Sequence, residues 1–177
     1  MENVPPPSRA RLEEEFSSEE IHSGSPLSFR GNFSHAIDEK GRVSLPAEFR
    51  RVLASSSSDR VVITNYISDG ARCLEGFAEE HWREFEEKLR SKSRFSSKLQ
   101  RLENFYLSRA AECAVDKAGR ILVPPHLRQY AGLERDVTFT SSIHGFRIWD
   151  SRVWNHVFQE TESALLEDPE LFADVDL

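Results

Sequence analysis

The chain has 177 residues and a formal net charge of −7, with 38% hydrophobic and 30% charged side chains. No apolar run approaches the roughly 18 residues that cross a bilayer, and residues 1–20 lack the apolar stretch of a signal peptide. We therefore expect neither a membrane protein nor a secreted one. The isolated cysteines Cys73 and Cys113 favour buried free thiols over a disulfide framework.

The charge is unevenly distributed along the chain. Residues 1–28 carry 2 basic and 6 acidic side chains, whereas residues 159–177 carry 7 acidic ones and no Lys or Arg. Residues 29–158 carry 21 basic and 17 acidic side chains, so the middle is mildly basic. Acidic ends of this kind are typical of solvated segments. We expect a flexible N-terminal extension over 1–28 and an acidic C-terminal tail over 159–177.

An internal repeat occupies the middle of the chain. The segment DEKGRVSLPAEFR (38–50) aligns without a gap with DKAGRILVPPHLR (116–128) at an offset of 78 residues. Self-similarity at a fixed offset indicates repeated structural units. The sequence therefore predicts two modules with one order of strands, over 29–110 and 111–158.

Each module is predicted to begin with a strand and a tight turn. The alternating runs 29–37 and 111–115 precede Asp-x-x-Gly-Arg in both copies. An Asp side chain can bond the backbone two residues on, and Gly readily adopts positive φ. The residues assigned to form the two turns are Asp38, Gly41, Asp116 and Gly119.

A return strand is expected after each turn, RVSL in the first copy and RILV in the second. Its alternation places Arg42 and Ser44 on one face and Val43 and Leu45 on the other. Prolines then mark the starts of short helices, over 47–53 and 125–133, with Gly132 as a C-cap of the second. Two hairpins follow, from strands 59–67 with 72–77 and 135–143 with 145–150.

Residues 78–110 between the modules have the spacing of amphipathic helices. The stretch SKSRFSS divides this segment into two predicted helices. The apolar stripe consists of Trp82, Phe85 and Leu89, followed by Phe95, Leu99, Leu102 and Tyr106.

The duplicated motif, together with FRIWDSRVW near the end of the second copy, resembles the MraZ family of bacterial transcriptional regulators. The likeness runs from about Phe29 to Phe158. It implies a mainly β fold with flanking helices, built as a tandem duplicated swapped-hairpin, double-split β-barrel related to AbrB and MazE modules. It also implies a ring homo-oligomer that binds double-stranded DNA at promoter direct repeats. Such a protein is expected to repress the division and cell-wall gene cluster, and to be cytoplasmic and nucleoid-associated.

The candidate DNA contacts lie in the two turns. A guanidinium can bond guanine or a phosphate bidentately, so Arg42 and Arg120 are assigned to base or phosphate contact. The neighbouring Lys40 and Lys117 are assigned to phosphates, which position without specifying. The alternative is that both arginines are structural partners of the neighbouring Asp residues. One loop offers few contacts, so a ring that repeats the loop is expected to bind by avidity.

Other functions find less support in the sequence. The six histidines show no metal-ligand spacing, and no P-loop, GxGxxG or GxSxG motif occurs. We expect no enzyme, cofactor, metal ion or small-molecule substrate. Arg50 and Arg128 are interpreted as solvated or interfacial, and the tryptophans as core or interface anchors. An antitoxin-like or scaffold protein, whose acidic C-terminal stretch binds another protein, remains the alternative.

Overall fold

The same order of elements, strand–strand–helix–strand–strand, occurs twice in the structure. The first copy consists of β1 (Asn32–Ala36), β2 (Arg42–Ser44), α2 (Ala47–Ser55), β3 (Arg60–Ser68) and β4 (Ala71–Ala78). The second consists of β5 (Ala111–Ala114), β6 (Arg120–Leu122), α5 (Pro125–Ala131), β7 (Asp136–Ser142) and β8 (Gly145–Asp150). The connection contains α3 (Glu79–Arg90), α4 (Ser97–Phe105) and the 3₁₀ turn η1 (Leu107–Arg109), and α6 (Ser151–Glu167) ends the chain. The predicted repeat of strand order and the division of the connection into two helices are both confirmed.

The computed structural model describes residues 28–55, 58–92, 96–168 and 170–171. Residues 1–27 of the predicted extension, Phe95 of the apolar stripe and residues 172–177 of the acidic tail lie outside these ranges. Helix α6 runs through the boundary predicted at 158/159 and continues to Glu167, with Val157 as its buried residue. The division into four segments, with its three boundaries, stays a prediction.

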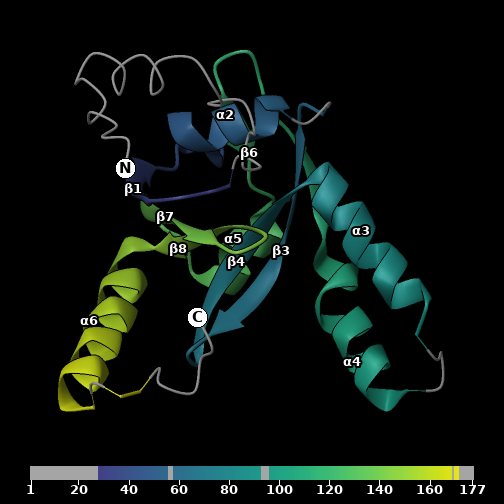
Figure 1. Cartoon of the computed structure of the whole chain (residues 1–177). Helices are drawn as coiled ribbons and strands as arrows, with labels where there is room; N and C mark the ends of the chain where they lie inside the picture. The colour runs from purple at the N-terminus through teal and green to yellow at the C-terminus, as the bar shows by residue number, and fades with distance from the viewer. Residues whose placement is uncertain (1–27, 56–57, 93–95, 169, 172–177) are drawn as a thin grey trace, which may run out of the picture.

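The described strands form two antiparallel sheets (Figure 1). The larger has the order β1-β7-β8-β4-β3-β5, and the smaller is a ribbon of β2 and β6. The edge strands β1 and β5 do not pair with each other, so neither sheet closes within the described ranges. The mainly β class is confirmed, whereas the closed barrel stays a prediction.

The two repeats exchange their first strands. Strand β1 pairs with β7 of the other repeat, with Phe33 opposite Phe139, and β5 pairs with β3, with Cys113 opposite Val61. Strand β2 pairs with β6. The predicted return strands are present as β2 and β6, but each pairs with the return strand of the other repeat and not with the strand before its own turn. This pairing places the apolar side chains Val43 and Ile121 side by side, and both are buried.

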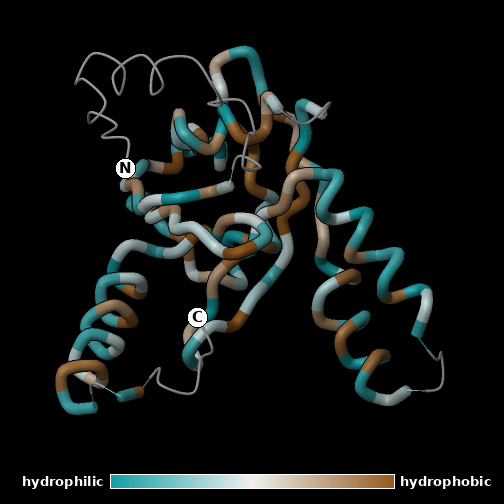
Figure 2. Tube along the Cα trace, viewed as in Figure 1, coloured by the Kyte–Doolittle hydropathy of each residue, from teal (hydrophilic) through white to brown (hydrophobic). Residues whose placement is uncertain are grey.

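The β2–β6 ribbon and helices α2 and α5 cover one face of the large sheet. Val43 and Ile121 of the ribbon are each 1% exposed, and both belong to the main core. Phe49 of α2 is fully buried, with its ring 5.2 Å from Phe29 and 5.5 Å from Phe146. Figure 2 shows hydrophobic segments gathered where the sheet meets α2 and β6. The core therefore supports the ribbon from beneath.

The opposite face of the sheet packs against α3 and α6. Trp82 of α3 contacts Phe77, and Trp149 packs with Cys73 and Val157. Burial of Trp82 and Trp149 confirms them as core anchors. Both cysteines are buried free thiols, as predicted. Burial raises the pKa of Cys73 to about 12 and that of Cys113 to about 11, so neither thiol is activated.

The packing around α2 yields a stability prediction. Phe49→Ala removes a fully buried ring and leaves a cavity, which costs about 3–5 kcal/mol of unfolding free energy. Phe158→Ala is the matched control, because Phe158 is 52% exposed. We expect the control to cost about 1 kcal/mol at most in urea unfolding. Equal losses in the two variants would contradict the assigned core.

Candidate nucleic-acid interface

The first turn is held by one carboxylate. Oδ1 of Asp38 accepts hydrogen bonds from the backbone N–H groups of Lys40 (3.0 Å) and Arg42 (2.9 Å). Oδ2 accepts from Nε of Arg42 (2.7 Å) and lies 2.7 Å from its Nη2. The N–H of Gly41 donates to the carbonyl of Asp38 (2.8 Å), and Gly41 has φ +85°. Asp38 therefore fixes both the turn and the guanidinium.

The second turn repeats this geometry. Oδ1 of Asp116 accepts from the N–H groups of Ala118 and Arg120, both at 2.9 Å. Oδ2 accepts from Nε of Arg120 (2.9 Å) and lies 2.8 Å from its Nη2. Gly119 has φ +75°. The sequence alternative, that each Arg is a structural partner of the neighbouring Asp, describes the geometry seen at both turns.

The Asp partners leave much of each guanidinium available. Arg42 and Arg120 use Nε and Nη2 toward the carboxylate, and their side chains remain 36% and 35% exposed. A guanidinium has five N–H donors, so about three remain on each. A side chain already held in place loses less conformational entropy when it binds a ligand. Each turn therefore presents an oriented set of donors.

Both arginines lie on the outward face of the β2–β6 ribbon. Arg42 is opposite Leu122, and Ser44 is opposite Arg120. Opposed residues of an antiparallel pair share a face, so these four side chains point away from the buried face of the ribbon. Arg42 and Arg120 are diagonal neighbours across the ribbon, and the backbones of such residues lie about 7–8 Å apart. This surface, made of Arg42, Ser44, Arg120 and Leu122, is called the outer ribbon face below.

Two further arginines lie against the turns, and each comes from the other repeat. A Cβ on Gly41 would lie 2.8 Å from Cζ of Arg128, and a Cβ on Gly119 would lie 2.6 Å from Nη1 of Arg50. Nε of Arg128 also donates to the carbonyl of Val123 (3.1 Å). These cross-repeat arginines, Arg50 and Arg128, form no ion pair with a described carboxylate. Arg50 and Arg128 align with each other in the repeat, and this is the one sequence signal that could have marked them. The sequence interpretation, as solvated or interfacial side chains, missed their contact with the turns.

The charges of the two turns differ. Lys40 and Lys117 are both exposed, but Lys40 aligns with Ala118, and Lys117 aligns with Glu39. The first turn carries two acidic and two basic side chains, whereas the second carries one acidic and two basic ones. The cross-repeat arginines add one positive charge beside each turn. The two turns and the cross-repeat arginines together therefore carry more basic than acidic side chains, although the whole chain is acidic.

The ion pairs shift the acid–base equilibria of the turns. The backbone N–H of Arg42, followed by its guanidinium, holds the pKa of Asp38 below its usual value. At Asp116 the guanidinium of Arg120 is the larger cause and its backbone N–H the second, and again the pKa is lowered. The Asp116 carboxylate raises the pKa of Arg120. Both pairs are therefore charged at neutral pH.

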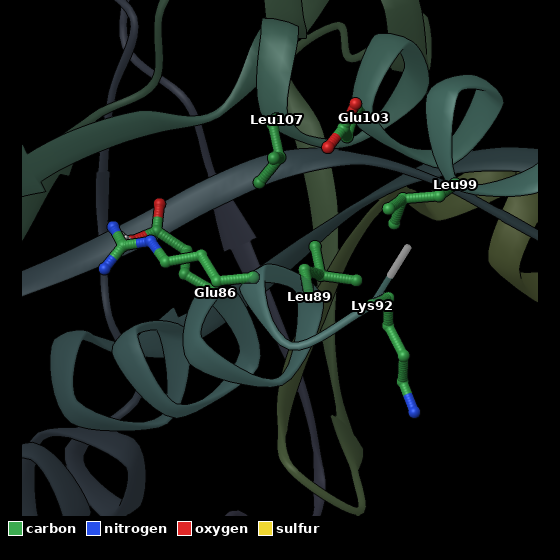
Figure 3. A pocket seen from close by; sticks show the side chains of 7 residues that line it. Glu86, Leu89, Lys92, Leu99, Glu103 and Leu107 are labelled. Carbon is green, nitrogen blue, oxygen red and sulfur yellow. Dashed lines mark ion pairs between the residues drawn. The ribbon is translucent and has the colours of Figure 1, made fainter. Parts of the chain in front are cut away.

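A separate hollow of about 370 Å³ lies between α3 and α4, away from the turns (Figures 1 and 3). Leu89, Leu99 and Leu107 point toward one another across it, and Arg90 pairs with Glu86 at 3.7 Å. None of the residues that line the hollow is a candidate DNA contact from the sequence. It is a groove of the connecting helices.

Neither a metal site nor a spanning helix was found in the described part of the chain. No group of three or more His, Cys, Asp or Glu side chains there could hold a metal ion. His22, one of the six histidines considered above, lies outside the described ranges. None of the described helices has the length and apolar character needed to cross a membrane.

Fold and turns together define a class: a duplicated β protein whose two repeats jointly build one arginine-bearing ribbon. The family described as "MraZ protein, putative antitoxin-like" matches the chain twice, over residues 28–105 and 106–173. The chain belongs to the MraZ family.

Curated relatives agree with this assignment. A protein of Geotalea daltonii named "Transcriptional regulator MraZ" is 40% identical over 156 residues, covering 81% of this chain and 96% of its own length. Proteins with the same name from Caldanaerobacter subterraneus subsp. tengcongensis and Natranaerobius thermophilus are 36% and 35% identical. These alignments cover 77% and 84% of this chain, and 91% and 99% of the relatives.

The contact of Arg128 with Gly41 can be tested by substitution. In Gly41→Ala the alanine is strained by the positive φ, and its Cβ also displaces the Arg128 guanidinium from its hydrogen bond to the Val123 carbonyl. Gly70→Ala, the control, has φ +73° but open space around a Cβ. We expect Gly41→Ala to lower the unfolding free energy by about 1 kcal/mol more than the control. The excess should vanish in an Arg128→Ala background, and an excess that persists there would contradict the contact.

The Asp–Arg turns also predict a pH dependence. A carboxyl group whose folded pKa is depressed stabilises the fold above its unfolded pKa, and this contribution is lost as pH falls through the folded pKa. For Asp38 and Asp116 the loss begins as pH falls below the unfolded value of 3.8. Asp38→Asn should therefore flatten the acid limb of a stability–pH curve measured by urea unfolding. An unchanged acid limb in Asp38→Asn would contradict the ion pair.

Proposed function

We propose that this protein is a sequence-specific DNA-binding transcriptional regulator that represses the division and cell-wall gene cluster. One observation carries the proposal: two guanidinium groups, each oriented by its own Asp, lie on a single exposed face of a two-stranded ribbon. The major groove of B-DNA is wide enough to admit such a ribbon. The names of the relatives support a role in transcription.

Arg42 and Arg120 are the proposed base contacts. Guanine offers O6 and N7 as paired acceptors in the major groove, which match the free donors of a guanidinium. Asp38 and Asp116 act through the arginines as positioning residues. Lys40 and the cross-repeat arginines add positive charge near the phosphates, as does Lys117, and phosphate contacts set register and affinity without reading sequence.

One ribbon makes few contacts, so we propose that binding requires a ring homo-oligomer. Several ribbons in a ring reach successive promoter repeats, and avidity then raises the affinity without new kinds of contact. The crossed β1 and β5 strands support the swapped-hairpin arrangement of the family's double-split barrel. A nucleoid-associated cytoplasmic location follows from the same proposal, as does the absence of catalytic activity.

The family description "antitoxin-like" favours one second candidate, a protein-binding role for the C-terminal segment. Helix α6 exposes Phe158 by 52% and Leu166 by 78%, which a protein partner would cover. Deletion of residues 159–177 separates the candidates. Promoter binding that survives the deletion supports the regulator, whereas a full chain that shows no preference for the promoter supports the second role.

Binding to the upstream region of the protein's own operon tests the regulator. Arg42→Ala and Arg120→Ala should each weaken specific binding roughly five- to a hundredfold, because each loses a bidentate base contact. Lys40→Ala should weaken promoter and unrelated DNA alike and lower the salt slope by about one unit. The measurement is fluorescence anisotropy over a series of salt concentrations.

The control for these variants is Arg90→Ala, which removes an exposed cation on α3, far from the ribbon. It should bind like the wild type. If both Arg42→Ala and Arg120→Ala keep the full preference for the promoter, the proposed function is contradicted.

A further inference from the structure

Leu122 is an exposed apolar side chain on the outer ribbon face. It is 54% exposed, whereas its neighbours Ile121 and Val123 are 1% and 0% exposed. It belongs to none of the hydrophobic clusters of the described residues. Alternation forces one side chain of this strand outward, but it does not require that side chain to be leucine.

The surroundings of Leu122 are polar and cationic. Its cross-strand partner is Arg42, and Arg120 lies two residues before it on the same face. Both guanidinium groups are held by Asp side chains and cannot fold over the leucine without breaking those bonds. The apolar surface of Leu122 therefore stays open between two oriented cations.

We propose that Leu122 is a specificity-determining residue that contacts the 5-methyl group of thymine. The inference rests on the proposed function, in which the outer ribbon face enters the major groove. Among the base edges exposed in that groove, the thymine methyl is the apolar group. Burying an exposed leucine against it gains free energy in proportion to the apolar area removed from water. Leu122 thus adds a preference for thymine beside the base pairs read by the arginines.

The first repeat offers different chemistry at the equivalent position. Ser44 is exposed opposite Arg120, and its hydroxyl both donates and accepts hydrogen bonds. The two halves of the ribbon therefore present Arg with Leu and Arg with Ser, although the backbone is nearly symmetric. An asymmetric reading surface fits a target without internal two-fold symmetry, repeated in one direction along the promoter.

The test compares thymine with uracil, which lacks the 5-methyl group. The upstream region of the protein's own operon is amplified once with dTTP and once with dUTP, and the full chain is titrated against both. Wild type should bind the uracil fragment about fourfold more weakly for each methyl contacted. Leu122→Ala should bind both fragments equally, with its affinity for the thymine fragment reduced to the uracil level.

Two variants serve as controls. Ile143→Ala removes an apolar side chain that is 90% exposed at the β7–β8 turn, and it should keep the wild-type preference for thymine. Arg90→Ala should keep it as well, because Arg90 is an exposed side chain on α3, away from the ribbon. Circular dichroism and the native mass of Leu122→Ala should match those of wild type.

The outcomes separate this inference from the proposed function. Equal wild-type binding to both fragments, with promoter preference intact and lost in Arg42→Ala, would overturn the role of Leu122 alone. A changed native mass of Leu122→Ala with an unchanged thymine preference would also overturn it and assign Leu122 to a contact between chains. Wild type that does not prefer the promoter over unrelated DNA would overturn the proposed function itself.

Discussion

The structure depends on the antiparallel pairing of β2 with β6, one strand from each repeat. Three residues in each strand are too few to bury a useful apolar surface alone. Paired, they place Val43 and Ile121 on the large sheet beneath α2, at 1% exposure each. Backbone bonds lock the ends, from Leu45 N–H to the Gly119 carbonyl (2.9 Å) and from Val123 N–H to the Gly41 carbonyl (3.0 Å). Neither repeat can therefore form its ribbon strand without the other.

This pairing converts a local turn motif into a surface. Each Asp-x-x-Gly-Arg turn, taken alone, is a small loop with a satisfied ion pair. Joined at opposite ends of one ribbon, the two turns bring Arg42 and Arg120 onto a common face. The Asp partners orient the arginines while leaving donors free, so a structural role and a contact role are compatible for the same side chain. The cross-repeat arginines extend this dependence, because each lies on the turn of the other copy.

Local features of the fold could be predicted from the sequence, whereas strand partners could not. The turns, the alternation in β2, the helix starts and the left-handed cap at Gly132 follow from residue types within a few positions of each other. The pairing of β1 with β7 joins residues about 100 positions apart, and local pattern carries no signal for it. The position of Arg128 over Gly41 is likewise a contact between the two repeats, for which the local pattern carries no signal. Lys40 and Lys117 occupy different positions in the two turns, and the alignment at an offset of 78 residues already shows this difference.

Hydrogen–deuterium exchange of the full chain, with and without the upstream fragment of its operon, tests the central claim most directly. If the ribbon built by both repeats is the DNA surface, peptides covering 38–45 and 116–123 gain protection together, and an unrelated fragment at matched salt protects them less. Protection confined to α6 or to the α3–α4 connection, with both turns unchanged, would contradict the account.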